Sequence, residues 1–442
     1  MNDLSKGTRT ALWTVLVAAQ VACVPAPTPR LTPSPSTAPI HTRPPVNTPT
    51  PTPTPAVTAT PSPLVPTAAL FPSATPTSSP TPTSTPFVPV TFRSIQMMDL
   101  ETGWAVADVG SEDETHVLRT ADGGVTWHEV SPVDNDFIGS FFLDARTAWT
   151  WAWDGGPAWR TQDGGQSWAP VGDFGGQPDL GFVDSQHGWK LDAESWGLSF
   201  VQFDIVSFST TQDGGMTWQE INPPPDRGVA FMAYPSAQMA WALRAGFAKT
   251  IEGVPNLGIP FHIQTTFDGG VSWITREMPL PPEAFRVERP YEGAYLGGSG
   301  NCDFISPVYS STAIWKLALT CERHSWMYTS ANQGKTWIIS DMPAGLGADI
   351  QFISASIGWL LIGDPYESPE GHLYQTTDGG QSWTLLKRTG WTDARLSFVD
   401  AQTGWAVACT DGYCYQREAE QALIKTTDGG QTWQILESQV SP

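Results

Sequence analysis

The sequence is short of basic residues, and this shortage argues against nucleic acid as a partner. Lys and Arg account for 23 of the 442 residues against 44 Asp and Glu, so the formal net charge is -21. Proteins that bind nucleic acid carry a clustered basic footprint, and no such cluster occurs in this sequence. Long apolar runs are also lacking, since none approaches the roughly 20 residues of a membrane-spanning helix. We therefore expect the chain to meet a membrane only through an attached lipid.

Cysteine is scarce as well, and its spacing does not suit a metal site. The chain has five cysteines, which are Cys23, Cys302, Cys321, Cys409 and Cys414. Zinc fingers place His and Cys ligands at short fixed spacings, and apart from His324 no histidine follows a cysteine in that way. We predict no metal, no cofactor and no catalytic residue.

The N-terminus has the arrangement of an export signal. Lys6 and Arg9 precede an apolar run over residues 11–19. Cys23 follows, as in a bacterial lipoprotein signal, although Gln20 stands where such signals usually have a Leu-like residue. We predict residues 1–23 as the signal with a lipid on Cys23; ordinary cleavage after Ala19 is the alternative. In either case we expect an exported protein at the cell surface or in the periplasm.

Residues 24–86 consist mostly of Pro, Thr, Ser and Ala, with few charges and few large apolar side chains. Such a segment cannot bury enough surface to offset the entropy of ordering it. We predict a disordered stalk over residues 24–86. Residues 87–442 remain, which is enough for one large all-β domain.

One octet occurs seven times along residues 87–442, with a spacing of roughly fifty residues. Its pattern is Thr/Ser-x-Asp-Gly-Gly-x-Ser/Thr-Trp, except in the fifth copy, which has Asn332-Gln333-Gly334 in place of Asp-Gly-Gly. Its acceptor residues are Asp122, Asp163, Asp213, Asp268, Asn332, Asp378 and Asp428, and its last residues are Trp127, Trp168, Trp218, Trp273, Trp337, Trp383 and Trp433. The glycines can adopt positive φ, and the Asp can accept bonds from the N–H groups that follow it. Seven copies around a ring cannot converge on one site, so we predict structural turns. Trp433→Ala should then cost about 3–5 kcal/mol as a core deletion.

A second motif, Phe-x-Asp-x-x-x-Gly-Trp, precedes each octet. It is clearest at residues 182–189 and 398–405, and weaker forms surround Trp149, Trp241 and Trp315. Each motif predicts two strands joined by a tight turn. Four antiparallel strands in each of seven repeats predict a seven-bladed β-propeller.

The four cysteines beyond Cys23 are predicted to form disulfides, as is usual in an exported domain. The motifs place Cys302 at the start and Cys321 at the end of one hairpin, roughly opposite each other. Cys409 and Cys414 flank the turn-like Thr-Asp-Gly-Tyr. We predict the pairs Cys302–Cys321 and Cys409–Cys414.

The octets resemble Asp-boxes, also called bacterial neuraminidase (BNR) repeats. Combined with the second motif, over roughly residues 90–438, they resemble the photosystem II stability/assembly factor propellers. That resemblance implies a non-enzymatic assembly factor that binds a membrane-protein subunit. Sialidases and xyloglucan-type glycosidases also carry Asp-boxes, but the sialidase motif Phe/Tyr-Arg-x-Pro is absent, because Phe92-Arg93 continues as Ser94-Ile95. Two-propeller glycosidases need about twice this length, and nothing places acidic pairs such as Asp134 and Asp136 across a cleft.

The long insertions are predicted on the face opposite the octets, where insertions in repeat proteins often mark the binding side. Their candidate binding residues are Trp196, Arg286, Arg289, Tyr291, Tyr295, Tyr366, Tyr413, Tyr415 and Arg417. Tyr and Arg are common interface anchors. We expect a monomeric, non-catalytic binding or scaffold module for a protein or glycan of the cell envelope. The alternative is a carbohydrate-binding propeller or a glycoside hydrolase/sialidase-like propeller.

Overall fold

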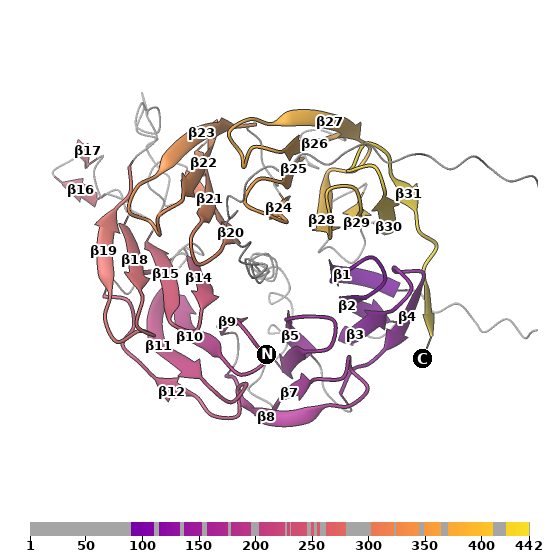
Figure 1. Ribbon diagram of the computed structural model, residues 1–442, viewed down its shortest axis with the longest axis horizontal. Helices are drawn as coiled ribbons and strands as arrows, with labels where there is room; N and C mark the ends of the chain where they lie inside the picture. Colours follow the sequence, from indigo (N-terminus) through magenta and orange to yellow (C-terminus); the bar gives the residue numbers. More distant parts are fainter. Residues whose placement is uncertain are drawn as a thin grey trace, which may run out of the picture. The chain divides into compact units, whose positions relative to one another are not determined.

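The computed structural model describes residues 90–109, 115–132, 137–152, 157–175, 178–195, 203–225, 228–229, 231–244, 249–251, 254–256, 262–279, 302–321, 324–343, 349–363, 370–409 and 421–441. These residues form strands and turns without a helix, and therefore include no apolar helix that could cross a membrane. Seven antiparallel sheets, each built around four strands, are arranged radially as a propeller (Figure 1). The predicted fold class is confirmed. The predicted signal and stalk, including Cys23, lie outside the described residues.

The first four blades follow the chain from its first described strand. Blade 1 contains β1 (Val90–Met97), β2 (Gly103–Val109), β3 (Thr115–Thr120) and β4 (Thr126–Glu129). Blade 2 contains β5 (Phe137–Phe142), β6 (Ala148–Ala152), β7 (Pro157–Thr161) and β8 (Ala169–Asp173). Blade 3 contains β9 (Asp179–Phe182), β10 (Gly188–Ser195), β11 (Phe203–Thr211) and β12 (Gln219–Glu220), and β13 (Gly228–Val229) also pairs with β11. Blade 4 contains β14 (Phe231–Ser236), β15 (Met239–Arg244), β18 (His262–Thr266) and β19 (Ile274–Glu277), with β16 (Lys249–Ile251) and β17 (Val254–Asn256) as a separate hairpin.

The last three blades complete the ring. Blade 5 contains β20 (Cys302–Ser310), β21 (Trp315–Cys321), β22 (His324–Ser330) and β23 (Ile338–Met342). Blade 6 contains β24 (Asp349–Phe352), β25 (Gly358–Ile362), β26 (Gly371–Thr376) and β27 (Thr384–Thr389). Blade 7 contains β28 (Asp393–Phe398), β29 (Gly404–Cys409), β30 (Gln421–Thr426) and β31 (Gln434–Ile435). The first strand of each blade is innermost (Figure 1), and β28 of the last blade lies against β1 of the first.

The ring is closed by a fifth strand on blade 1. β32 (Gln439–Ser441) pairs in parallel with the outermost strand β4, with Val440 opposite Trp127. The backbone N–H of Gln439 donates to the Val125 carbonyl at 3.0 Å, and the Ser438 hydroxyl donates to the Gly124 carbonyl at 2.6 Å. The two ends of the described chain therefore share one sheet.

The second motif works as a lock between neighbouring blades. Its Trp stacks on the Phe of the next blade: the ring centroids are 3.6 Å apart for Trp359 and Phe398, and 3.7 Å apart for Trp149 and Phe182. The glycine before the Trp leaves room for the Phe of its own blade, since a Cβ on Gly404 would lie 2.4 Å from the Phe398 ring. Each motif therefore contributes to two packing contacts, one within its own blade and one with the next blade.

The Trp of the second motif is buried more completely than the Trp of the octet. Seven tryptophans at or beside the second-motif position are fully buried, which are Trp104, Trp149, Trp189, Trp241, Trp315, Trp359 and Trp405. Of the octet tryptophans only Trp127, beside β32, is fully buried, whereas the other six are partly exposed. The octet Trp, predicted as a core residue, is therefore fully buried in blade 1 and only partly buried in the other six blades.

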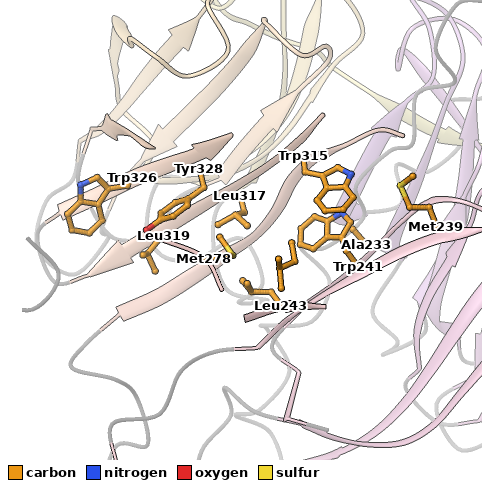
Figure 2. Packing of buried hydrophobic residues seen from close by; sticks show 11 residues of the cluster. Ala233, Met239, Trp241, Leu243, Met278, Trp315, Leu317, Leu319, Trp326 and Tyr328 are labelled. Carbon is orange, nitrogen blue, oxygen red and sulfur yellow. The ribbon is translucent and has the colours of Figure 1, made fainter. Parts of the chain in front are cut away.

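Blade 5 departs from this register. Trp315 lies opposite Ser330, which is the place that Gly404 occupies opposite Thr426 in blade 7. Trp315 consequently packs beside Trp241 of blade 4, with centroids 5.4 Å apart (Figure 2). Its assignment as the Trp of a second motif was wrong by one residue. Lys316 stands in that position instead, opposite Thr329.

Candidate functional faces of the propeller

The face that carries the octets is built from turns whose polar groups form hydrogen bonds within the same turn. In blade 7, one oxygen of Asp428 accepts from the Thr426 hydroxyl at 2.8 Å and from the Thr432 N–H at 2.9 Å. Its other oxygen accepts from the Thr432 hydroxyl at 2.5 Å. Gly429 and Gly430 have φ values of 77° and 101°, which other residues rarely adopt. The carboxylate is therefore used within its own turn.

These hydrogen bonds keep the octet carboxylates ionised. The hydroxyl and then the backbone N–H of Thr432 lower the pKa of Asp428 to about 2. Ser167 does the same for Asp163, whose pKa is also about 2. A group with so low a pKa is not a proton donor near neutral pH. The carboxylates of the octet face thus stabilise their turns and are not suited to acid–base chemistry.

We expect the chain to lose stability in acid through these turns. A folded-state pKa of about 2 lies below the unfolded value of about 4, so the contribution is present above pH 4 and is lost as the pH falls toward 2. Urea unfolding of wild type and Asp428→Asn at several pH values checks this. The variant should lose less stability than the wild type between pH 4 and 2. Parallel curves for the two proteins would contradict the assignment.

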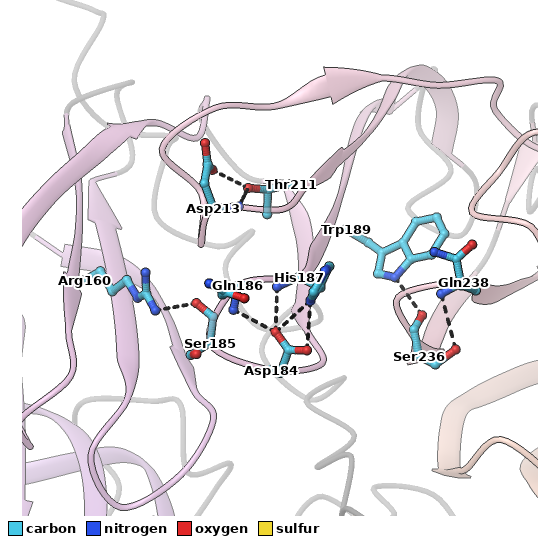
Figure 3. A network of polar contacts seen from close by, with 10 residues as sticks. All are labelled: Arg160, Asp184, Ser185, Gln186, His187, Trp189, Thr211, Asp213, Ser236 and Gln238. Atoms are coloured by element: carbon cyan, nitrogen blue, oxygen red, sulfur yellow. Dashed lines mark hydrogen bonds and ion pairs between the residues drawn. The ribbon is translucent and has the colours of Figure 1, made fainter.

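The two tight turns of each blade lie together on this face. In blade 7 the N–H of Gly429 donates to the Gln402 carbonyl at 2.8 Å. In blade 3 the N–H of Gly214 likewise donates to the Gln186 carbonyl at 2.8 Å. Figure 3 shows this part of the ring, with Arg160 of blade 2 reaching the Ser185 carbonyl of blade 3. Such bonds tie turns within and between blades and leave the face nearly uniform.

The opposite face holds the ends of the strands that bound the long insertions. These boundaries include Ser195 and Phe203 in blade 3, Ile362 and Gly371 in blade 6, and Cys409 and Gln421 in blade 7. The predicted binding residues Trp196, Arg286, Arg289, Tyr291, Tyr295, Tyr366, Tyr413, Tyr415 and Arg417 all lie outside the described residues. Strand direction still fixes the face from which their loops leave the blades. Their role stays a prediction.

The backbone places two of the predicted disulfide partners opposite each other. Cys302 and Cys321 are direct cross-strand partners in blade 5. Opposed antiparallel residues have Cα atoms about 4.5–5.5 Å apart, which lies within the range of disulfides. Cys409 is buried, and Cys414 lies outside the described residues. Both pairings therefore remain predictions.

A polar cluster where the innermost strands of blades 6 and 7 begin was missed by the sequence reasoning. Asp349 of β24 accepts from the Leu396 N–H of β28 at 2.7 Å. Asp393 pairs with Arg395 at 3.2 Å. Burial raises the pKa of Asp349 to about 6, despite the attraction of Arg395. In blade 3, burial likewise raises the pKa of Asp179 to about 7. The only sequence signal was an Asp at or near the first residue of an innermost strand.

We expect Asp349→Asn to raise stability above pH 6. The folded-state pKa of Asp349 exceeds the unfolded value of about 4, so stability is full below pH 4 and falls as the pH rises through 6. Asn keeps an oxygen for the Leu396 N–H but carries no charge. Thermal or urea unfolding at pH 7 should show a gain on the order of 1–2 kcal/mol that disappears near pH 4. A gain that is equal at both pH values would contradict the burial explanation.

The described residues contain no group of three or more His, Cys, Asp or Glu side chains that could hold a metal ion. Retaining and inverting glycosidases need two carboxyl groups that flank a sugar. Asp349 and Asp393 are instead engaged with the backbone and with Arg395, respectively. The arrangement can hold two blades together and can respond to pH.

No family model and no curated protein matches the chain. Among solved structures, an oligogalacturonate lyase in complex with manganese is similar at 11% identity and a TM-score of 0.51, over 77% of this chain and 91% of that chain. YCF48 from Cyanidioschyzon merolae is similar at 16% identity and a TM-score of 0.43, over 78% and 97%. An ancestral GH74 enzyme is similar at 11% identity and a TM-score of 0.42, over 78% and 44%. At these identities, likeness shows the fold alone.

Proposed function

We propose that this chain is a non-catalytic, exported binding propeller that recognises a protein or glycan of the cell envelope on its insertion-bearing face. A lipid on Cys23 and the stalk over residues 24–86 would tether the propeller to the membrane. Binding by one side of a rigid ring is a common use of repeat architectures.

The observation that carries the proposal is the contrast between the two faces. On the octet face, the acceptors of Asp163, Asp213, Asp378 and Asp428 are all bound within their own turns. Because these carboxylates already accept hydrogen bonds from their own turns, they have little remaining capacity to bind a ligand. The seven repeats differ most from one another in insertions rich in Tyr and Arg, which the direction of the strands predicts on the other face. Tyr and Arg side chains are common interface anchors, and Tyr loses little conformational entropy on binding.

The resemblance to photosystem II assembly factors favours protein binding within this proposal. It rests on the paired motifs, such as residues 398–405 followed by residues 426–433 in blade 7. A propeller supports many activities, so fold likeness to the lyase does not by itself favour an enzyme.

Capture of partners from envelope extract by the full chain tests the proposal. The combined change Arg286→Ala, Tyr291→Ala and Tyr295→Ala should abolish capture while leaving the melting curve unchanged. Val271→Gln is the matched control, because Val271 lies in the blade 4 octet and is 71% exposed. Loss of capture in the control alone would place binding on the octet face and overturn the proposal.

The alternative is a carbohydrate-active enzyme, and it is tested by a separate measurement. Sialidases and xyloglucan-type glycosidases share the octet, so a glycan array followed by an assay for released sugar distinguishes the two. Glycan binding without turnover is consistent with a binding module. Turnover that the triple variant abolishes would replace the proposal with a glycosidase or lyase.

Tethering is tested separately. Metabolic labelling with a palmitate analogue should mark the wild type and should fail with Cys23→Ser. Label that persists in the variant would exclude Cys23 as the anchor. Secretion of unlabelled wild type would favour cleavage after Ala19 instead.

A further inference from the structure

The interface between blades 5 and 6 has a lysine where the other blades have a tryptophan. The indole N–H of Trp359 donates to the Gly429 carbonyl of the next blade at 2.9 Å, and Trp405 and Trp149 make the same bond with their neighbours. At the equivalent place, Lys316 Nζ donates to the Gly379 carbonyl of blade 6 at 2.6 Å. It also lies over the Phe352 ring, 5.3 Å from its centroid. Lys316 thus copies two of the contacts of the missing indole.

A cavity lies beside Lys316, the residue that stands where the other blades have Trp. Because a lysine side chain is thinner than an indole, it cannot fill the same space between two blades. A cavity of about 150 Å³ lies at this interface on the octet face. This space is open to solvent on one side, and its volume is comparable to that of a cavity that holds benzene. Its lining residues are Ile314, Lys316, Thr329, Ala331, Ile338, Ser340, Ala355, Asp378, Gly379 and Gln381.

Lys316 has no counter-ion in this cavity. The residue is 2% exposed, and within the part of the chain that the structure describes its Nζ donates only to the Gly379 carbonyl and to the Thr329 hydroxyl at 3.2 Å. An ammonium group has three N–H donors, so one remains unused. Among the described residues, no carboxylate lies within ion-pair distance of Nζ. Burial lowers the pKa of Lys316 to about 8, against the weaker attraction of Asp378.

Asp378 is the other charged group that lines the cavity, and it does not supply the missing partner. Its Oδ1 accepts from the Thr376 hydroxyl and the Ser382 N–H, and its Oδ2 accepts from the Ser382 hydroxyl. These bonds direct the carboxylate into its own turn. A buried cation without a partner is costly, and a ligand that brings a negative charge would remove that cost.

We propose that this cavity binds a small organic acid, whose carboxylate accepts the third N–H of Lys316 and whose apolar body packs on Ile314 and Ile338. The cavity lies on the octet face, so this inference is independent of the proposed function. A carboxylate fits better than an amide because it neutralises the ammonium, and charge-assisted bonds are roughly twice as strong as neutral ones. The ligand class is a short acid with a compact apolar group.

Benzoate and its uncharged analogue benzamide test the inference with the full chain. We expect saturable benzoate binding at pH 7, measured by ligand-observed NMR, and at least about tenfold weaker binding of benzamide. Benzoate affinity should fall about tenfold between pH 7 and pH 9 as Lys316 loses its proton. Equal binding of the two compounds, or no saturable benzoate binding, would overturn the inference.

Two substitutions at Lys316 separate charge from shape. Lys316→Trp restores the residue found in the other blades, so it should close the cavity, keep or raise the melting temperature and abolish benzoate binding. Lys316→Met keeps the cavity but removes the charge, so benzoate should lose its advantage over benzamide. Lys425→Met is the matched control, since Lys425 lies 4.5 Å from the Trp405 ring at another interface and should not affect binding. Benzoate binding that survives Lys316→Trp would rule out this site.

Discussion

Replacement of Trp405 by Ala is expected to lower the free energy of unfolding by about 3–5 kcal/mol, the range for deleting a buried Trp. Trp405 is fully buried, and its indole N–H donates to the Gly123 carbonyl of blade 1 at 2.8 Å. The change would leave a cavity and an unsatisfied carbonyl at the interface where blade 7 meets blade 1. Because this interface closes the ring, the loss should affect the whole propeller.

Urea unfolding of Trp405→Ala and Trp433→Ala measures this effect with a matched pair from one blade. Trp433 is only half-buried, although it contacts Trp391 and Phe398 edge-on. Its removal should cost about 2 kcal/mol, because the transfer free energy follows the buried area. This value is lower than the sequence alone indicated. A larger loss for Trp433→Ala than for Trp405→Ala would contradict the interface role of the second motif.

Truncation after Glu437 is expected to destabilise the propeller by about 2–4 kcal/mol, from the burial of Val440 and the loss of two or three hydrogen bonds. β32 pairs with β4 and covers Trp127, the octet Trp that is fully buried. Without β32, Trp127 should become as exposed as the octet Trp of the other blades. The tryptophan fluorescence of the whole chain should therefore shift to the red at a lower urea concentration than in the full-length protein.

A milder variant controls for this truncation. Ser441→Ala removes only the contact of its hydroxyl with His128 Nδ1 at 2.6 Å and keeps the backbone pairing, so it should cost less than 1 kcal/mol. The truncated chain and the full chain should differ clearly in their unfolding midpoints. Identical midpoints would show that blade 1 closes without β32.

In blade 5, the spacing of residues along the sequence does not predict which residues of β20 and β21 pair. Trp315 follows Val308 by the same seven residues that separate Trp405 from Phe398. The turn of blade 5 is nevertheless shorter: Ser310 pairs with Trp315, whereas Phe398 pairs with Gly404. Irregularities in β20 around Pro307 shift the pairing further. Bulges change which residues face each other without changing their separation in sequence.

The polar cluster of Asp349, Asp393 and Arg395 was invisible for a related reason. Asp349 meets Leu396 only because two innermost strands of different blades lie side by side. No local pattern marks such a contact, since Asp349 alone has the character of a polar strand position and Leu396 that of a buried apolar one. The uncompensated charge of Lys316 is likewise a property of its surroundings.

The fold class, the number of blades and the turn chemistry of the octets follow from the amino-acid sequence alone. Those features are local: one octet contains the acceptor, the donors and the glycines that its turn requires, and recurrence supplies the count. The closure of the ring, the burial of each Trp and the place where a lysine replaces a Trp are instead set by packing between blades. These depend on pairs such as Trp405 and Gly123, which are 282 residues apart. Contacts across that separation are set by the packing of whole blades, which no short segment encodes.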